Sequence, residues 1–155
     1  MGIKVLFLDI DGVLNNKDIT RYHKGRPGEY AYGVFTGEDY FDPRCVQNLN
    51  TIIKETGAKI VISSSWRLLF DMETLTDFFV SQKIEGEIIG YTNRFSGERG
   101  HEIQEWLDRH EEVEKFVILD DNTDMAHLTD YLVKTTWESG LEEHHVKEAI
   151  RILNC

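Results

Sequence analysis

The chain has 155 residues, of which 28 are acidic and 17 are Lys or Arg, so its formal net charge at pH 7 is −11. This length predicts one domain over residues 1–155 with a sizeable core. The charge disfavours a protein whose main task is to bind long nucleic acid through its phosphates. No stretch approaches the ~20 apolar residues of a membrane helix, and the two cysteines lack a framework spacing, so we expect a cytoplasmic protein without a membrane segment.

An apolar run at residues 4–8 opens the chain and leads into Asp9, Ile10, Asp11 and Gly12. Such runs are typical of strands buried on both faces of a parallel sheet, where ligands bind at the carboxyl ends of the strands. Side chains two residues apart leave the same side of a strand, so the two carboxylates need a cation, a shared proton or a special task. An ordinary polar turn is the alternative interpretation, because Asp and Gly are also common turn residues.

Helical and strand patterns alternate along the rest of the chain. Asp42 and Pro43 predict the start of a helix, and Gly57 predicts its end. Further strands are predicted at 59–62, 87–91, 115–119 and 131–135, and further helices at 73–82, 101–110 and 141–153. This alternation predicts an α/β fold with a doubly wound parallel sheet of about five strands.

An insert at about residues 15–41 separates the first strand from the first helix. Its part from Asn16 to Tyr32 is locally basic and contains tyrosines at positions 22, 30 and 32. Such a segment can attract an anion and stack on an aromatic ring, which would make it a flap over a site. A solvated loop with scattered charges fits the pattern equally well.

Polar residues also follow two later strands. After the strand at 59–62 come Ser63, Ser64, Ser65, Trp66 and Arg67. After the strand at 115–119 come Asp120, Asp121, Asn122, Thr123 and Asp124. Because the carboxyl ends of parallel strands share one edge of the sheet, both groups should converge with the aspartates that follow the first strand.

Carboxylates without a His or Cys partner form a hard, oxygen-only site, which suits Mg²⁺ far better than zinc. A divalent cation would offset the repulsion between aspartates and bridge to a phosphate, so that one aspartate can attack phosphorus and another can protonate the leaving oxygen. The other phosphoryl oxygens need donors, for which Ser64 and Arg99 are the candidates. The alternatives are a surface arginine in a glycine turn and serine hydroxyls that cap the next turn.

These motifs together resemble the haloacid dehalogenase (HAD) superfamily of phosphatases, over nearly the whole chain. They are Asp9-Ile10-Asp11-Gly12-Val13, a Ser near 64, the basic residue Arg99, and Leu119-Asp120-Asp121 with Asp124. The resemblance implies a Rossmann-like fold and an aspartyl-phosphate intermediate, with Asp9 as the nucleophile and Asp11 as the general acid and base. It also implies that Mg²⁺ is held by the Asp9 carboxylate, the Asp11 backbone carbonyl and an acid of the fourth motif, which is Asp121 with Asp120 and Asp124 left open.

The stretches Ser64-Ser65-Trp66-Arg67 and Arg99-Gly100-His101-Glu102-Ile103 are similar to a small branch of this superfamily found alongside RNA-repair enzymes. The similarity places the phosphate-binding hydroxyl at Ser64, with Ser63 and Ser65 one residue away. Gly12, Ser65 and Arg67 are further candidates for substrate binding. The chain departs from the family pattern in having Arg99 where Lys is common, and in having one residue fewer than usual between Asp121 and Asp124.

The size of the cap domain governs substrate size in this superfamily, and the insert is too short for a full cap, which implies an open site. We therefore expect a Mg²⁺-dependent phosphomonoesterase that acts on a small phosphorylated substrate, such as a nucleotide, or on a nucleic-acid terminus. A non-catalytic phosphate-binding or regulatory domain is the alternative, but the presence of both Asp9 and Asp11 favours an enzyme. The histidines lack ligand spacing, and His144 and His145 are expected to face solvent.

Overall fold

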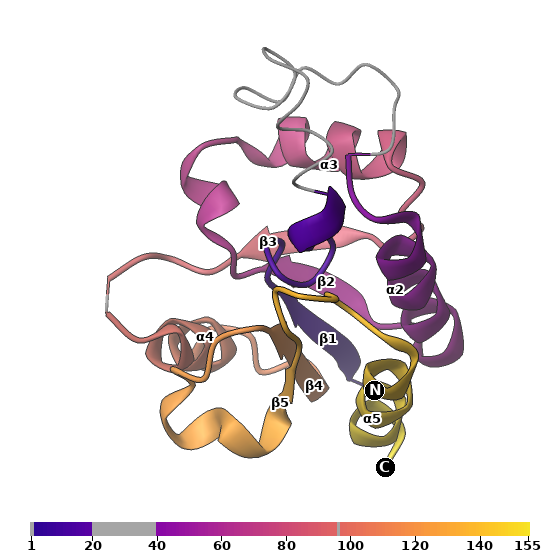
Figure 1. The fold of residues 1–155 in the computed structure, drawn as a ribbon. Helices are drawn as coiled ribbons and strands as arrows, with labels where there is room; N and C mark the ends of the chain where they lie inside the picture. The colour runs from indigo at the N-terminus through magenta and orange to yellow at the C-terminus, as the bar shows by residue number, and fades with distance from the viewer. Residues whose placement is uncertain (1, 20–39, 96) are drawn as a thin grey trace.

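A five-stranded parallel sheet forms the centre of the computed structural model, which describes residues 2–19, 40–95 and 97–155 (Figure 1). The strand order is β3-β2-β1-β4-β5. The strands are β1 (Ile3–Leu8), β2 (Lys59–Ile62), β3 (Ile88–Tyr91), β4 (Val113–Asp120) and β5 (Leu132–Lys134). Most of the predicted insert at 15–41 lies outside the described residues, so the flap hypothesis stays a prediction.

Helices cover both faces of this sheet. They are α2 (Pro43–Thr56), α3 (Met72–Ser81), α4 (Arg99–Asp108) and α5 (Glu143–Asn154), with the short 3₁₀ helices η1 (Ser65–Leu68) and η2 (Ala126–Tyr131). Side chains of α2, α3 and α5 pack together on one face, and those of α4 and η2 pack on the other. The predicted α/β fold with a doubly wound parallel sheet is therefore confirmed. No helix within the described ranges is long and apolar enough to span a bilayer.

The apolar run of β1 is continuous because the strand is buried on both faces. Leu6 and Leu8 join the core under α2, α3 and α5, while Val5 and Phe7 join the core under α4. All four side chains are fully buried, and burial of each contributes about 1.5–3 kcal/mol to the free energy of unfolding. The carboxyl end of β1 is thus held in the middle of the sheet.

The predicted boundaries of α2 are confirmed by its caps. The Asp42 carboxylate accepts a hydrogen bond from the backbone N–H of Arg44 at 2.9 Å, and Gly57 adopts φ of 72° while its N–H donates to the Ile53 carbonyl at 2.8 Å. These contacts satisfy backbone groups that have no partner inside the helix. The two 3₁₀ helices were not predicted, since one or two turns are too short to show a hydrophobic period.

The prediction that His145 faces solvent is wrong. Its side chain is only 6% exposed, and its Nδ1 accepts a hydrogen bond from the backbone N–H of Glu142 at 2.9 Å. The ring thereby satisfies an amide at the start of α5 that has no acceptor within the helix. His144 is exposed, as predicted.

The order in which the chain adds strands to the sheet reverses between β1 and β4. The chain moves from β1 to β2 and β3 on one side, and the later strands β4 and β5 lie on the other side. In open α/β sheets, ligands bind at such a switch point, outside the carboxyl ends of the two strands. The topology therefore places a binding crevice where β1 and β4 end.

Gly100 is a position at which the fold should tolerate no side chain. Its N–H donates to the Asp124 carbonyl at 3.0 Å, and a Cβ would collide with the backbone of Met125. We expect Gly100→Ala to lower the free energy of unfolding by about 1–3 kcal/mol, measured by urea denaturation. In the control Gly97→Ala the new Cβ meets no atom within 4 Å, so its effect should stay within about 0.5 kcal/mol. Equal stabilities of the two variants would contradict this packing.

Candidate active site

Three carboxylates meet at the switch point. Asp9 directly follows β1, Asp120 ends β4, and Asp121 follows it; one carboxylate oxygen from each lies within 4.8 Å of the others. The Asp9 side chain is 6% exposed and the Asp120 side chain is fully buried. The N–H of Asp9 donates to the Leu119 carbonyl at 3.0 Å, which ties the two strand ends together. These three residues are called the acid cluster below.

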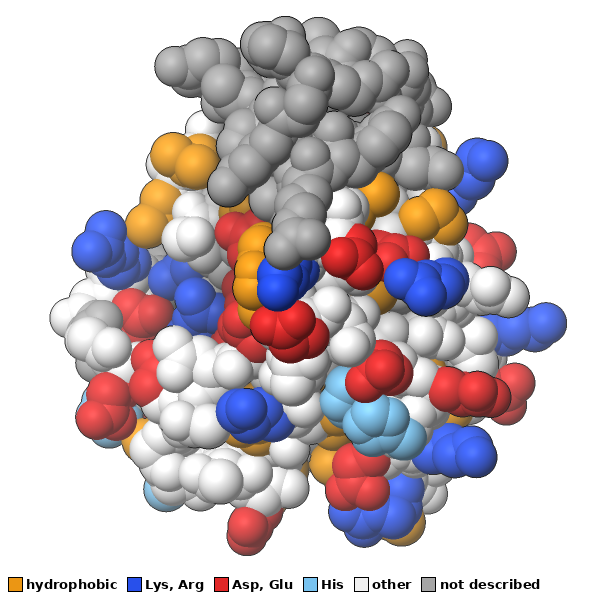
Figure 2. Space-filling view, in the orientation of Figure 1, with side chains coloured by type: hydrophobic (Ala, Val, Ile, Leu, Met, Phe, Trp, Pro, Cys, Tyr) orange, Lys and Arg blue, Asp and Glu red, His pale blue; other side chains and the backbone are white. Residues whose placement is uncertain are grey.

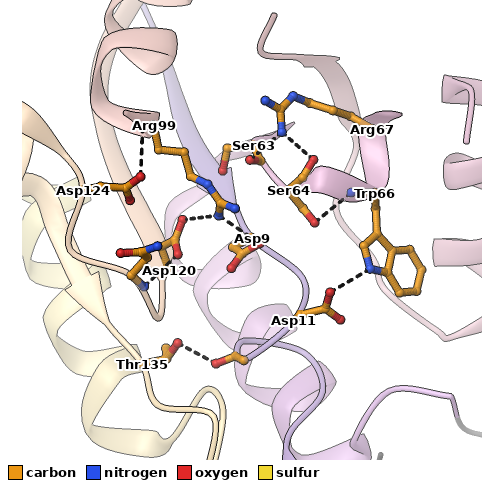
Figure 3. Close-up of polar contacts among 12 residues, drawn as sticks. Asp9, Asp11, Ser63, Ser64, Trp66, Arg67, Arg99, Asp120, Asp124 and Thr135 are labelled. Atoms are coloured by element: carbon orange, nitrogen blue, oxygen red, sulfur yellow. Dashed lines mark hydrogen bonds and ion pairs between the residues drawn. The ribbon is translucent and has the colours of Figure 1, made fainter. Parts of the chain in front are cut away.

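One arginine bridges two members of the acid cluster (Figure 3). Nη1 of Arg99, the first residue of α4, donates to Asp120 Oδ2 at 2.6 Å and lies 3.1 Å from Asp9 Oδ1. A single guanidinium cannot balance three carboxylates. The cluster therefore retains negative charge in a site largely withdrawn from water.

Burial dominates the ionisation of the cluster. Burial, and after it the negative charge of Asp120, raise the pKa of Asp9 to about 8 against the opposing effect of Arg99. Burial also raises the pKa of Asp120. Burial disfavours the charge on Arg99, but the carboxylates of Asp9 and Asp120 outweigh that effect and raise its pKa. Without a further cation, the carboxylates do not all ionise readily near neutral pH.

The acid cluster has the chemistry of a magnesium site. All of its donors are carboxylate oxygens, which are the hard ligands that Mg²⁺ prefers. The negative charge that Arg99 leaves unbalanced also favours a divalent cation. Asp9, Asp120 and Asp121 are therefore the residues of this site that fit the metal.

Gly12 lets the loop after β1 approach the acid cluster. Its φ is 85°, and a Cβ at this position would collide with the Asp121 carboxylate. The Gly12 carbonyl accepts from Thr135 Oγ1 at 2.6 Å, and its N–H donates to Asn15 Oδ1 at 3.0 Å. The residue therefore occupies the predicted place at the site, where its lack of a side chain leaves room for an acid.

Asp124 lies beside the start of α4. Its Oδ2 accepts from the backbone N–H of Arg99 at 3.3 Å, and its carbonyl accepts from Gly100. Both contacts fix the helical turn that carries the Arg99 guanidinium into the acid cluster. Its other carboxylate oxygen, Oδ1, is buried and has no hydrogen-bond partner among the described residues, so the predicted role of Asp124 as a metal ligand stays a prediction.

The Asp11 carboxylate forms its hydrogen bonds with Asn15 and Trp66 and not with the acid cluster. Its Oδ1 accepts from Asn15 Nδ2 at 2.8 Å, and its Oδ2 accepts from Trp66 Nε1 at 3.2 Å (Figure 3). Because β1 ends at Leu8, before either aspartate, the alternation of a strand does not set the directions of Asp9 and Asp11. Neither Asn15 nor Trp66 was among the site residues predicted from the sequence.

The serines after β2 have three different environments. Ser63 donates its N–H to the Leu8 carbonyl at 3.0 Å, which places it beside Asp9; its buried Oγ has no hydrogen-bond partner among the described residues. Ser64 is also buried, and its Oγ accepts from the Trp66 N–H at 3.2 Å as the cap of η1. Ser65 is exposed. Ser63 is thus the serine that lies beside Asp9 and whose hydroxyl has no hydrogen-bond partner among the described residues.

Arg67 is committed to the protein itself. Its side chain is 5% exposed; it donates to the carbonyls of Ser63, Ser64 and Thr92 at 2.7–2.9 Å and to Glu102 Oε1 at 3.1 Å. Burial lowers the pKa of Arg67, and the charge of Glu102 opposes that shift. The structure therefore does not present Arg67 as a free donor for substrate, and its contacts instead join the ends of β2 and β3 to α4.

A second group of potential metal ligands lies at the start of α5. It comprises Glu142, His144 and His145, whose ligand atoms also lie within 4.8 Å of one another. The His145 Nδ1 lone pair is engaged by the Glu142 N–H, as described above. In this group His145 serves as a helix cap, and the expectation that the histidines are not metal ligands stays a prediction.

The parallel sheet and the acid cluster at its switch point are of the kind that a phosphatase-type HAD domain uses. Over residues 5–146 the sequence matches the family described as the HAD domain in Swiss Army Knife RNA repair proteins. The chain therefore belongs to this RNA-repair branch of the superfamily, as its motifs predicted. No curated protein and no solved structure matches the chain.

The raised pKa of Asp9 predicts a stability difference that depends on pH. Unfolded Asp9 ionises near pH 3.8, whereas folded Asp9 ionises near pH 8, so its effect on stability is absent below pH 3.8 and becomes increasingly unfavourable up to pH 8. In EDTA, Asp9→Asn should therefore have a higher Tm than the natural protein at pH 8, by several degrees, and a similar Tm at pH 4. About 1 kcal/mol corresponds to about 2–4 °C in a domain of this size.

The control for this comparison is Asp130→Asn, which removes an exposed carboxylate outside the acid cluster. Its Tm should follow that of the natural protein across the pH range. A Tm gap for Asp9→Asn that does not widen with pH would contradict the unfavourable burial of the Asp9 charge.

Proposed function

We propose that this protein is a Mg²⁺-dependent phosphomonoester hydrolase that acts through an aspartyl phosphate on Asp9. The observation that carries the proposal is the acid cluster at the switch point, in which Arg99 bridges two of three converging carboxylates. Membership of the HAD family supports a phosphatase-type function in general. The proposal assigns that function to named groups.

Asp9 and Asp11 divide the reaction between them. An Asp9 carboxylate oxygen attacks phosphorus, the bond from phosphorus to the leaving oxygen breaks, and the leaving oxygen takes a proton from the Asp11 carboxylic acid. In the second half, Asp11 takes a proton from a water molecule whose oxygen attacks phosphorus. The bond between phosphorus and Asp9 then breaks, and inorganic phosphate leaves.

The acid cluster would hold Mg²⁺, which supplies positive charge that lets the anionic Asp9 approach an anionic phosphate. Asp9, Asp120 and Asp121 contribute carboxylates, and the family resemblance adds the backbone carbonyl of Asp11. Arg99 gives a fixed positive charge beside the nucleophile. Asp124 holds the start of α4 and so keeps Arg99 in place.

Ser63 and Ser64 are the proposed donors to the phosphoryl oxygens. The free Oγ of Ser63 and its position beside Asp9 favour Ser63 over Ser64, whose hydroxyl already caps η1. A hydroxyl that lacks a protein partner remains available for an anionic ligand.

The substrate class we propose is a nucleotide or a phosphorylated nucleic-acid terminus. The family description supports it, because that family occurs in RNA repair proteins. The net charge of −11 weighs against extended contact with a long nucleic acid and leaves a short end as the better fit.

Cys45 and Cys155 are both free thiols, which agrees with a reducing cytoplasmic location.

Phosphate release tests the proposal directly. With p-nitrophenyl phosphate and with 3′- or 5′-phosphorylated oligonucleotides, the natural protein should release phosphate with Mg²⁺ and lose this activity in EDTA. Asp9→Asn should lower kcat by about 10³-fold or more, because the attacking oxygen is lost. Asp11→Asn should remove most of the rate but keep the rise in Tm that Mg²⁺ causes, because only its backbone carbonyl is assigned to the metal.

Turnover by Asp9→Asn at the natural rate would refute the nucleophile assignment. Loss of the Mg²⁺-dependent Tm shift in Asp11→Asn would contradict a metal role confined to its backbone. Mg²⁺ and phosphorylated ligands could raise the Tm of the natural protein without any release of phosphate. That result would favour the alternative function predicted from the sequence, a non-catalytic phosphate-binding domain.

Ser63→Ala and Ser64→Ala separate the two serine hydroxyls. Ser63→Ala should lower kcat/KM by roughly 10–100-fold, the effect of one hydrogen bond to a charged group. It should leave stability nearly unchanged because its Oγ has no hydrogen-bond partner among the described residues. Ser64→Ala should instead lower the free energy of unfolding by about 0.5–2 kcal/mol through loss of the η1 cap. The reverse pattern would assign phosphate binding to Ser64.

A further inference from the structure

We infer that Trp66 and Asn15 are positioning residues that aim the Asp11 carboxyl at the leaving oxygen. The inference rests on the proposed function, because it concerns how the general acid of that reaction is oriented. It is carried by a geometric fact: both oxygens of the Asp11 carboxylate receive a side-chain N–H, one from each of these two residues.

Asp11 needs such support because it is an exposed residue beyond the end of β1. An aspartate there is free to rotate about its side-chain bonds, and proton transfer requires it to stay within hydrogen-bond reach of the leaving oxygen. Each carboxylate oxygen has two lone pairs. Trp66 and Asn15 each occupy one lone pair, one on each oxygen. A proton on Asp11 must therefore bind to a remaining lone pair, so the two N–H donors determine the direction in which the acid donates its proton.

The indole of Trp66 is itself held rigidly. Its ring stacks on Phe78 with centroids 5.8 Å apart and an interplanar angle of 11°, and it contacts the rings of Tyr40, Phe41 and Phe70 at 5.7–5.8 Å. Its backbone N–H is fixed by Ser64 Oγ. Because these contacts come from α3, from the residues on either side of η1 and from the segment before α2, the Nε1–H donor has little freedom to follow a moving Asp11.

Asn15 is held by a hydrogen bond within the loop after β1. It is buried, its Oδ1 accepts from the Gly12 N–H at 3.0 Å, and its Nδ2 donates to Asp11 Oδ1 at 2.8 Å. The Gly12 amide can only donate, so it orients the Asn15 amide with its NH₂ group toward Asp11. The carboxylate is therefore clamped between a loop amide and a packed indole.

Kinetics with different leaving groups distinguish positioning of an acid from a merely structural role. Trp66→Phe keeps an aromatic ring and removes the donor. We expect it to lower kcat/KM for an alkyl phosphate about tenfold more than for p-nitrophenyl phosphate, because a good leaving group needs little help from a proton. The matched control is Trp106→Phe, a buried tryptophan packed against Phe7 in the other core, which should affect both substrates equally.

The double variant Asp11→Asn, Trp66→Phe shows whether the indole acts through Asp11. It should be no slower with the alkyl phosphate than Asp11→Asn alone, since a positioning residue has nothing left to position. An unchanged leaving-group dependence in Trp66→Phe, or a further loss in the double variant, would overturn the inference while the proposed phosphatase function stands.

Nuclear magnetic resonance tests the contact without activity. The chain has three tryptophans, so the indole N–H signal of Trp66 is identified by its loss in Trp66→Phe. Asp11→Asn should shift this signal upfield and leave those of Trp106 and Trp137 unchanged. If the protein releases no phosphate but shows this shift, the proposed function is wrong and the contact between Trp66 and Asp11 stands. If the signal does not move, the contact itself is wrong.

Discussion

The confinement of three carboxylates around one guanidinium is the constraint on which this site depends. Asp9, Asp120 and Asp121 converge where β1 and β4 end, and among the described residues Arg99 is the cation that pairs with them. Burial makes full ionisation of this cluster costly, as the raised pKa of Asp9 shows. The same imbalance prepares the site for a cation and, through that cation, for an anionic substrate. The unfavourable electrostatics of the acid cluster and its proposed function thus have one physical origin.

The surrounding contacts keep these groups in place. Gly12 lets the loop after β1 approach Asp121, and the tight turn at Gly100 holds the start of α4 against the loop after β4. Arg67 and Glu102 form a buried ion pair that joins the ends of β2 and β3 to α4. Each of these contacts links segments that are distant in sequence. The site is therefore a product of the whole strand-end region.

Charge is distributed unevenly around the proposed reaction centre. Figure 2 shows acidic side chains gathered at the centre of this face, with Lys and Arg around them. The net charge of −11 makes extended contact with a phosphate backbone unfavourable, whereas a single terminal phosphate needs only the local donors and the metal. This distribution agrees with the proposed action at a phosphorylated end and not along a strand.

From the amino-acid sequence one can predict the alternating strands and helices, the caps of α2 and the meeting of Asp9 with Asp120 and Asp121. These features follow from hydrophobic period, cap chemistry and the rule that parallel strands share a carboxyl edge, all of which are local or topological. The three-dimensional fold was needed to show that Ser63 has a hydroxyl without a partner among the described residues, that Arg67 is engaged by Glu102, that His145 is buried and that Trp66 reaches Asp11. Such pairings depend on strand register and on side-chain packing between distant segments, and residue spacing along one chain does not contain that information.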